Sequence, residues 1–411
     1  MKDWKKSRPE KAQRHILKAL AENVNFNDGS YALGYPVSRL DTKVFHDAPF
    51  LKDAPLLSAY VANPNHIGCH TVGKSEHAFS GTQRIERDAL SIVAETIFKA
   101  EENSYDGYIA AGGTEANIQA LWIYRNIFLK KHAARLDEIA IITSEDTHYS
   151  IAKGSNLLMV DFIKVPVDFH TRAIDTPAYI NLLEQAIRNG KKYFIVVANM
   201  GTTMFGSVDD PLVYTEALKQ RNLPFFLHID AAYGGFIYPF LNEDSTLNFT
   251  NPDISSMTVD AHKMLQAPYG TGIFLCRNGL IENVLTEDAS YVEGLDLTLC
   301  GSRSGANVIA VWMILKAYGY NGWFEKVKVL QMRTDWLCKQ LNELSVGYFR
   351  EPFMNIVTLN AEFVSPELAS RFQLVPEKHG GGNQWYKIVV MDHVEVEVLE
   401  ELLAGIGTVS A

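Results

Sequence analysis

Residues 176–230 read TPAYINLLEQAIRNGKKYFIVVANMGTTMFGSVDDPLVYTEALKQRNLPFFLHID, and this stretch decides the fold class. It holds two amphipathic helical segments, 176–188 and 211–221, and each leads to a short apolar run, 193–198 and 225–230. Helices that alternate with short apolar strands are typical of a mostly parallel sheet covered on both faces by helices. We therefore expect an α/β protein.

The same alternation continues on both sides of this stretch. Further helices are predicted at 9–23, 85–99, 115–129, from Tyr149, at 306–318 and at 394–403, and further strands at 108–110, 139–143 and 161–164. Residues 41–82 are rich in Pro, Gly, His and Asn, which predicts loops laid over a pocket. We expect an N-terminal helical segment (1–60), a large domain (61–305), and a linking helix with a small α+β C-terminal domain (306–411).

Composition restricts the kind of partner. The chain has 411 residues, 47% of them hydrophobic, and a formal net charge of -10, which argues against nucleic acid as a main partner. No apolar stretch approaches the roughly 20 residues that span a bilayer, and the first residues lack the apolar core of a signal peptide. Four cysteines without a C-x-x-C pair suit a reducing compartment and argue against structural zinc. We expect a cytoplasmic enzyme with no metal site.

The strongest chemical signal is SSMTVDAHKM at 255–264, which leads into GTGIFL at 270–275. Lys263 stands between a strand-like run and a glycine-rich turn, so we expect its side chain to be drawn toward the interior. Burial favours the neutral amine, which is the species that condenses with an aldehyde to form a Schiff base. Lys263 is therefore a candidate anchor for an aldehyde cofactor. The alternative is a lysine in a solvated loop.

A carboxylate ends the apolar run PFFLHID at 224–230. Asp230 would be costly there unless a cation meets it, and a protonated pyridine nitrogen is such a cation. Each unit by which the carboxylate raises the pKa of the pyridine represents roughly 1.4 kcal/mol. Ala232 is small enough to let a flat ring lie against the backbone. The alternative is that Asp230 caps a helix at the strand exit and that Ala232 only packs.

An anion site is predicted where AGGTEAN, at 111–117, joins a strand to a helix. Free backbone N–H groups, the positive helix end and the Thr114 hydroxyl point to one place. The spacing fits neither the P-loop nor the G-x-G-x-x-G pattern, which argues against ATP and NAD. GSRSG at 301–305 offers a second cluster of donors, although Ser304 could instead be a helix N-cap.

Two other strand exits carry polar side chains. In TSEDTHYS, at 143–150, His148 could lie flat on a cofactor ring, and ANMGTT, at 198–203, places hydroxyl groups nearby. Each segment could also be purely structural. These exits belong to one edge of the predicted sheet, and ligands of such sheets bind at that edge, which favours a chemical role.

Taken in order, these motifs resemble the group II pyridoxal-phosphate decarboxylases of fold type I, which include glutamate, aromatic amino acid, tyrosine and bacterial histidine decarboxylases. The resemblance covers about residues 60–320 and rests on an ordered set of motifs: GGTEAN, SEDTHYSIAK, NMGTT, HIDAAYGG, DAHK and GSRSG. It implies a fold type I architecture and pyridoxal 5'-phosphate as the cofactor.

The resemblance also implies roles for individual residues. Lys263 would form the Schiff base and His262 would touch the phosphate. Asp230 would pair with the pyridine nitrogen, Ala232 would pack under the ring, and His148 would stack above it.

The remaining implied contacts involve the phosphate and the ring hydroxyl. Gly113 and Thr114 would bind the phosphate, and Thr203 would lie near the ring hydroxyl. Ser302 would reach the phosphate of a neighbouring subunit, which requires a homodimer with shared active sites.

Some positions differ from the aromatic decarboxylases. Only 286–301 fills the place of their long mobile loop, as in the short-loop bacterial and archaeal members, and Tyr291 is the candidate proton donor there. Lys387 stands where an arginine would hold the substrate carboxylate. Sphingosine phosphate lyase is similar too, through NPNH at 63–66, DAHK and GSR.

The predicted reaction is removal of the α-carboxylate of an L-amino acid, with release of CO2 and an amine. The cofactor ring accepts the electrons, and Tyr291, His148 or Lys263 returns a proton to the same carbon. Three alternatives remain at this point: carbon–carbon cleavage, transamination, and a catalytically silent dimeric homologue. The side chain of the substrate stays open among acidic, aromatic, imidazole-bearing and diamino acids.

Overall fold

The computed structural model describes Leu33, Asp41 and residues 66–67, 80–287, 294–377 and 382–407. The helix predicted at 9–23 and nearly all of the loops predicted at 41–82 lie outside the described residues. The first long described range begins with α4 (Ser80–Ser91), which runs into a π-helical turn, η3 (Ile92–Ile97). The helix predicted at 85–99 therefore begins five residues earlier than expected.

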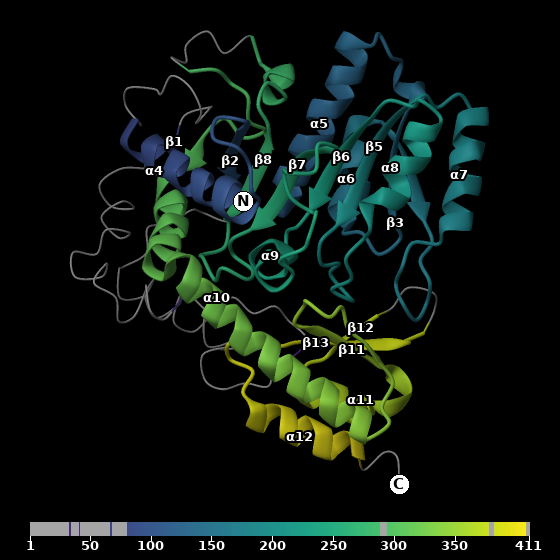
Figure 1. Ribbon diagram of the computed structural model, residues 1–411, viewed down its shortest axis with the longest axis vertical. Helices are drawn as coiled ribbons and strands as arrows, with labels where there is room; N and C mark the ends of the chain where they lie inside the picture. The colour runs from purple at the N-terminus through teal and green to yellow at the C-terminus, as the bar shows by residue number, and fades with distance from the viewer. Residues whose placement is uncertain are drawn as a thin grey trace, which may run out of the picture.

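A seven-stranded sheet forms the centre of the molecule (Figure 1). Its strands, in spatial order, are β2 (Tyr105–Ala110), β8 (Gly272–Arg277), β7 (Ile254–Asp260), β6 (Phe225–Asp230), β5 (Tyr193–Asn199), β3 (Ile139–Ser144) and β4 (Asp161–Val165). Strands β7, β6, β5, β3 and β4 are parallel, and β8 is antiparallel to both of its neighbours. The predicted mostly parallel sheet is confirmed.

Helices cover both faces of this sheet. One face packs on α5 (Gly113–Lys131) and α6 (Tyr149–Leu158), and the other packs on α4, α7 (Thr176–Arg188), α8 (Pro211–Gln220) and α10 (Gly305–Glu343). Strand β5 shows why, because Phe194, Val196 and Ala198 join one core while Ile195 and Val197 join the other.

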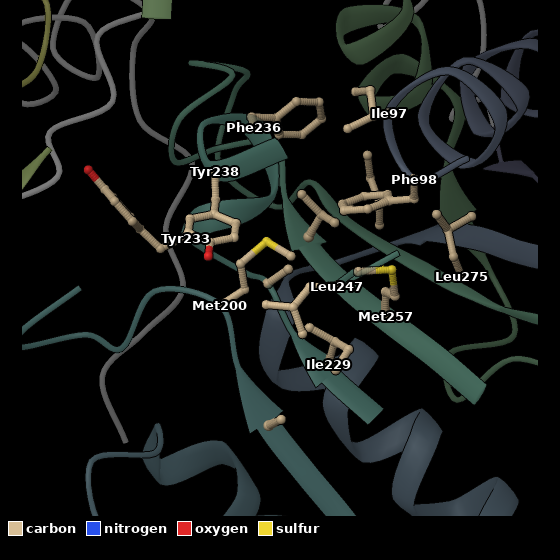
Figure 2. Close-up of a cluster of buried hydrophobic side chains, with 14 of the residues drawn as sticks. Ile97, Phe98, Met200, Ile229, Tyr233, Phe236, Tyr238, Leu247, Met257 and Leu275 are labelled. Atoms are coloured by element: carbon tan, nitrogen blue, oxygen red, sulfur yellow. The ribbon is translucent and has the colours of Figure 1, made fainter. Parts of the chain in front are cut away.

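Part of the first core is drawn in Figure 2, where Ile229, Met257 and Leu275 from three neighbouring strands gather near Ile97 and Phe98. Each such side chain contributes about 1.5–3 kcal/mol when it is fully buried. This apolar layer holds the strands in place, and so fixes the positions of the residues at their ends.

Asp–Pro signals set the starts of two covering helices. Asp175 caps α7 by accepting a hydrogen bond from Ala178 N at 2.9 Å, and Pro177 occupies the first turn. Asp210 caps α8 through Leu212 N at 2.9 Å, with Pro211 at its first position. Both starts agree with the sequence expectation.

A smaller α+β unit follows the sheet, as predicted. Its four strands lie in the order β10 (Tyr348–Phe349), β11 (Ile356–Asn360), β13 (Trp385–Val389) and β12 (Val375–Pro376), all antiparallel. The end of α10, α11 (Pro366–Arg371) and α12 (Val396–Gly407) pack on this sheet around a separate apolar core. Figure 1 places this unit below the central sheet, joined to it by the long α10.

The helix predicted at 306–318 is only the first half of α10, which continues to Glu343. The break falls at Gly319, where φ is 62° and ψ is 179°, a non-helical conformation that glycine adopts readily. The predicted end of this helix at residue 318 was therefore wrong, because the helix is kinked at Gly319 and continues beyond it.

Short elements complete the described structure. They are β1 (His66–Ile67), paired with β9 (Arg303–Ser304), and α9 (Tyr238–Leu241), with 3-10 turns η4 (Leu136–Glu138), η5 (Gly234–Phe236), η6 (Ile281–Val284) and η7 (Ala361–Phe363). In the described part of the chain, no helix combines the length and apolar character needed to cross a membrane.

Candidate active site

The carboxyl ends of the parallel strands meet at one edge of the central sheet. Ser144, Asn199, Asp230 and Asp260 each end a strand there, and Ala110 ends β2 at the same edge beside Gly272 of β8. Because the strands are in register, polar groups that are far apart in the sequence converge at this edge.

A cleft of about 640 Å³ opens at this edge, and a smaller pocket adjoins it. The cleft is lined by the turn at Gly112–Thr114 and by His262, and the pocket by Asp230 and Thr203. Three residues line both cavities: His148, Ala232 and Lys263. Nine of the ten residues predicted for the site lie in the described chain, and eight of these nine line the two cavities.

Lys263 differs from expectation in its surroundings. Its side chain is 24% exposed rather than drawn fully inside, and Nζ lies 3.0 Å from Asp260 Oδ2. The Asp260 side chain is 4% exposed, and its other oxygen, Oδ1, has no hydrogen-bond partner in the described structure. An ion pair with a buried carboxylate, not burial in an apolar environment, is what holds this amine in the cleft.

Asp230 is 6% exposed and is held by two donors. Asn117 Nδ2 donates to Oδ2 at 2.8 Å, and Ala232 N donates to Oδ1 at 3.1 Å. The second contact closes a turn directly after β6. Each oxygen keeps a lone pair free to accept a further hydrogen bond, as pairing with a ring N–H requires.

His148 is the N-cap of α6. Its Nδ1 accepts a hydrogen bond from Ser150 N at 3.3 Å and lies 2.9 Å from Ser150 Oγ. Burial lowers the pKa of His148, and the nearby charge of Lys263 lowers it further, against the opposing effect of Asp230. The imidazole is therefore neutral near pH 7, with its proton on Nε2.

The turn before α5 has the features of an anion site. The first N–H groups of α5 have no acceptor within the helix. A side chain at Gly113 would place its Cβ 2.7 Å from Asp260 Oδ2, so the close approach of this turn to β7 requires glycine. His262 Nδ1 lies 3.0 Å from the carbonyl of Thr271, which fixes the ring beside the turn.

Other predicted residues lie at the edge of the site or beyond it. Ser302 is exposed and does not line either cavity, whereas its neighbour Arg303 is buried in an ion pair with Glu86. Ser304 caps α10 by accepting from Asn307 N at 3.3 Å, which is the structural alternative considered for that motif. Tyr291 lies outside the described residues.

Sequence reasoning missed two residues that the structure brings into the site. Asp260 pairs with Lys263. Like Asp230, it is a carboxylate at the end of an apolar strand, and that position is the signal that indicates it in the sequence. Asn117 stands inside the quoted GGTEAN motif, but its contact with Asp230 joins residues 113 positions apart and has no local signal. Among the described residues, no three His, Cys, Asp or Glu side chains gather as a metal site.

Comparison with known proteins identifies the family of this chain. Residues 51–358 match the pyridoxal-dependent decarboxylase conserved domain. The protein belongs to the pyridoxal-dependent decarboxylase family. The decarboxylase is 50% identical over 404 residues to a tryptophan decarboxylase of Clostridium sporogenes, and the alignment covers 98% of this chain and 97% of that protein.

Solved structures agree with the fold. An L-methionine decarboxylase from Streptomyces sp.590 aligns with a TM-score of 0.80 at 20% identity, covering 98% of this chain and 95% of the other. A sphingosine-1-phosphate lyase from Burkholderia pseudomallei also aligns with a TM-score of 0.80, at 15% identity, covering 100% and 92% of the two chains. At such identities these likenesses establish the fold type I architecture alone.

The decarboxylase uses pyridoxal phosphate to remove the α-carboxylate of an amino acid. The cleft fits this cofactor by its own chemistry. It combines an amine held beside a buried carboxylate, a glycine turn at a helix N-terminus, and a second buried carboxylate in the adjoining pocket. These groups suit an aldehyde, a phosphate and a basic ring nitrogen respectively.

Proposed function

We propose that this decarboxylase acts on aromatic L-amino acids, with L-tryptophan as the preferred substrate. The observation that carries the proposal is the 50% identity to a tryptophan decarboxylase along nearly the whole chain. The lining of the cleft supports it, because Ile118, Tyr149, Tyr269 and Leu299 present apolar or aromatic surface. Such surface suits an indole or phenyl ring.

The basic residues described around the two cavities leave no cation for an acidic side chain on the substrate. Among the described lining residues, the basic side chains are Lys263, His148 and His262, and all three are assigned to the cofactor. A second carboxylate on the substrate would then meet Glu115 and Asp260 without a cation of its own. Burying an unpaired charge in this way is costly.

Pyridoxal phosphate, when bound, supplies an aldehyde for the substrate amine and a ring that accepts electrons. We propose that Lys263 holds the aldehyde and that Asp230 keeps a proton on the ring nitrogen. His148 and Ala232 would pack on the two faces of the ring, and Thr203 would lie near its hydroxyl.

Phosphate binding is assigned to Gly113, Thr114 and His262, and proton return to Tyr291, His148 or Lys263. These assignments rest on the positions of the described residues around the two cavities and on the motifs that carry the resemblance. Tyr291 enters through the motifs alone.

A panel of amino acids tests the substrate. We expect kcat/KM for L-tryptophan to exceed that for L-aspartate by at least about 100-fold, because the apolar lining offers an extra carboxylate no cation. CO2, amine and aldehyde are measured for L-tryptophan, L-tyrosine, L-phenylalanine, L-methionine, L-aspartate and L-glutamate. A preference for aspartate or glutamate would refute L-tryptophan as the preferred substrate. Aldehyde formed without CO2 would favour carbon–carbon cleavage.

We further assign the substrate carboxylate to Lys387. This residue lies on β13 and is 5% exposed. Its Nζ donates a hydrogen bond at 3.0 Å to the carbonyl of Thr203. Thr203 lines the smaller of the two cavities, which also contains Asp230 and is called the ring pocket. Within the described ranges no carboxylate forms an ion pair with it, so its charge is available to an anionic ligand. Burial, and then the charge of Lys263, lower the pKa of Lys387 to about 8.

This pKa predicts an alkaline limb in the pH profile. Above about pH 8 the Lys387 ammonium loses its proton, so kcat/KM should fall with rising pH while kcat changes less. In Lys387→Arg the guanidinium stays charged and the limb should move to higher pH. In Lys387→Met, KM should rise about 10-fold or more at pH 7. An unchanged alkaline limb in Lys387→Met would remove the residue from carboxylate binding.

The proposed assembly is a homodimer whose partner completes each cleft. Tyr149, Tyr269 and Leu299 line the cleft and yet are 64%, 72% and 42% exposed in the single chain. A second copy that covered them would remove apolar surface from water. A second copy of the chain is thus the proposed cover of this surface.

A cytoplasmic location is also proposed. The described cysteines Cys276, Cys300 and Cys338 are all free thiols, which suits a reducing compartment.

Subunit complementation tests the role of Ser302 across the dimer. Ser302→Asp should weaken pyridoxal phosphate binding about 10-fold or more, because the new carboxylate repels the phosphate. At a pyridoxal phosphate concentration that fills wild-type sites and leaves Ser302→Asp sites mostly empty, Lys263→Ala and Ser302→Asp chains produced together should recover about a quarter of the wild-type activity, since half of randomly paired dimers are mixed and each has one intact site. Absence of recovery would show that Ser302 does not act on the neighbouring subunit.

A further inference from the structure

We propose that Asn117 is a positioning residue that orients both Asp230 and His148, and that His228 fixes the orientation of the Asn117 amide. The inference rests on the proposed roles of Asp230 and His148 at the cofactor. It adds a buried relay of hydrogen bonds, defined here as Tyr124, Ser256, His228 and Asn117, that reaches these two residues from the core.

The Asn117 side chain stands at a fork. Its Nδ2 lies 2.8 Å from Asp230 Oδ2 and 2.9 Å from Ser150 Oγ. A carboxylate only accepts hydrogen bonds, so the nitrogen of the amide must face Asp230. Its second hydrogen goes to Ser150, whose own hydroxyl hydrogen is then free for His148 Nδ1 at 2.9 Å. One amide thereby sets the carboxylate and the imidazole proposed to contact the ring.

The other end of the amide shows which nitrogen of His228 carries the proton. Asn117 Oδ1 lies 3.0 Å from His228 Nε2, and an amide oxygen can only accept, so Nε2 carries a proton. Burial lowers the pKa of His228 to about 4, so the ring is neutral near pH 7 and Nδ1 accepts. Thr258 Oγ1, 3.3 Å from the same Nε2, is a second and weaker acceptor for that proton.

The relay begins at the Tyr124 hydroxyl, a donor that has no other role in the site. Ser256 Oγ lies 2.6 Å from His228 Nδ1 and therefore donates to it, while Tyr124 donates its hydroxyl to Ser256. Burial raises the pKa of Tyr124 well above its usual value, so this hydroxyl keeps its proton. Every hydrogen bond then points one way, from Tyr124 through Ser256 and His228 to Asn117.

The relay places buried polar side chains among apolar neighbours, which indicates a role beyond packing. Tyr124, Ser256, His228 and Asn117 are at most 1% exposed, and they cross a layer whose neighbours, such as Ala116 and Ala120, are apolar. Polar side chains in such a layer cost free energy unless every partner is present, and apolar residues would pack there without that cost. Without the His228 donor, the Asn117 amide could turn and present Oδ1 to Asp230. The amide oxygen and the carboxylate oxygens would then repel each other.

The test separates donor orientation from packing. Apoprotein of Asn117→Leu, His228→Leu and His228→Gln is titrated with pyridoxal phosphate, and its thermal unfolding is followed without cofactor. We expect Asn117→Leu and His228→Leu to weaken cofactor binding by about 10- to 100-fold. His228→Gln keeps an N–H donor within reach of Asn117 Oδ1 and should stay within about 3-fold of the wild type.

Asn126→Leu is the matched control. Asn126 lies on the same helix, is 9% exposed, and its Nδ2 donates to the Asn283 carbonyl at 3.1 Å, away from the cavities. Its loss should lower the unfolding temperature of the apoprotein and leave cofactor binding unchanged. The visible absorption band of the bound cofactor should shift in its pH dependence in Asn117→Leu and His228→Leu, and not in Asn126→Leu.

Two results would overturn the inference, and Asp230→Ala distinguishes them. If Asp230→Ala weakens cofactor binding while His228→Leu and His228→Gln bind equally well, the relay does not orient the site. If Asp230→Ala itself leaves the affinity and the spectrum unchanged, the proposed role of Asp230 fails and the relay has nothing to position. Where His228→Leu does not fold, Asn117→Leu beside Asn126→Leu gives the same comparison.

Discussion

Lys263→Ala should lower the rate of decarboxylation by at least about 10⁴-fold, the largest effect expected of any single change in this chain. Nζ of Lys263 is the amine in the cleft, 3.0 Å from the buried Asp260 carboxylate, and it borders both the cleft and the ring pocket. Under the proposed role of Lys263, loss of the amine removes the group that would bond the cofactor aldehyde. The measurement is tryptamine formation from L-tryptophan, with borohydride reduction to trap the cofactor on its lysine.

Two further variants sharpen this result. Lys263→Arg keeps a cation beside Asp260 and cannot bond the aldehyde, so it should be as inactive as Lys263→Ala while unfolding at a higher temperature. Lys219→Ala is the control, because Lys219 is a half-exposed lysine paired with Asp253 at 2.5 Å on the surface. Near-normal turnover in Lys263→Ala, or reduced cofactor found on another lysine, would refute the assignment.

The fold could be predicted from local patterns because its strands are short, apolar and separated by helices with clear start signals. The helix at 176–188 and the strand at 225–230 have the predicted bounds, and each is set by residues adjacent in the sequence. The long α10 was not predicted whole, because a glycine in a helical pattern predicts an end and a kink equally well. Packing against the smaller unit decides between the two.

The site was predictable to the extent that its residues end strands. Asp230 and Lys263 stand in motifs whose local pattern already indicates chemistry, and the sheet brings them together. The surroundings of these residues were not predictable. Asn117, His228 and Asp230 meet through contacts between a helix and a strand that are more than 100 residues apart in the sequence. The ion pair between Lys263 and Asp260 likewise depends on a turn geometry that periodicity does not reveal.

Asp230→Ala is expected to have the second largest effect, a loss of about 10³ in kcat/KM, which corresponds to about 4 kcal/mol. The Asp230 carboxylate is buried at the end of β6 and held by Asn117 and Ala232, so it faces the ring pocket in one fixed orientation. A carboxylate there raises the pKa of a ring nitrogen and keeps the ring charged, which strengthens it as an electron acceptor. The measurement is kcat/KM for L-tryptophan across pH 6–9.

A cofactor analogue gives this prediction its sharpest form. Pyridoxal phosphate with carbon in place of the ring nitrogen has no proton for Asp230 to hold, so wild-type protein loaded with it should be about as slow as Asp230→Ala with the natural cofactor. Combining the two changes should cost little more than either alone, because both remove the same interaction. Asp230→Glu keeps the charge but lengthens the side chain, and should recover part of the loss. Additive losses would mean that Asp230 acts on something other than the ring nitrogen.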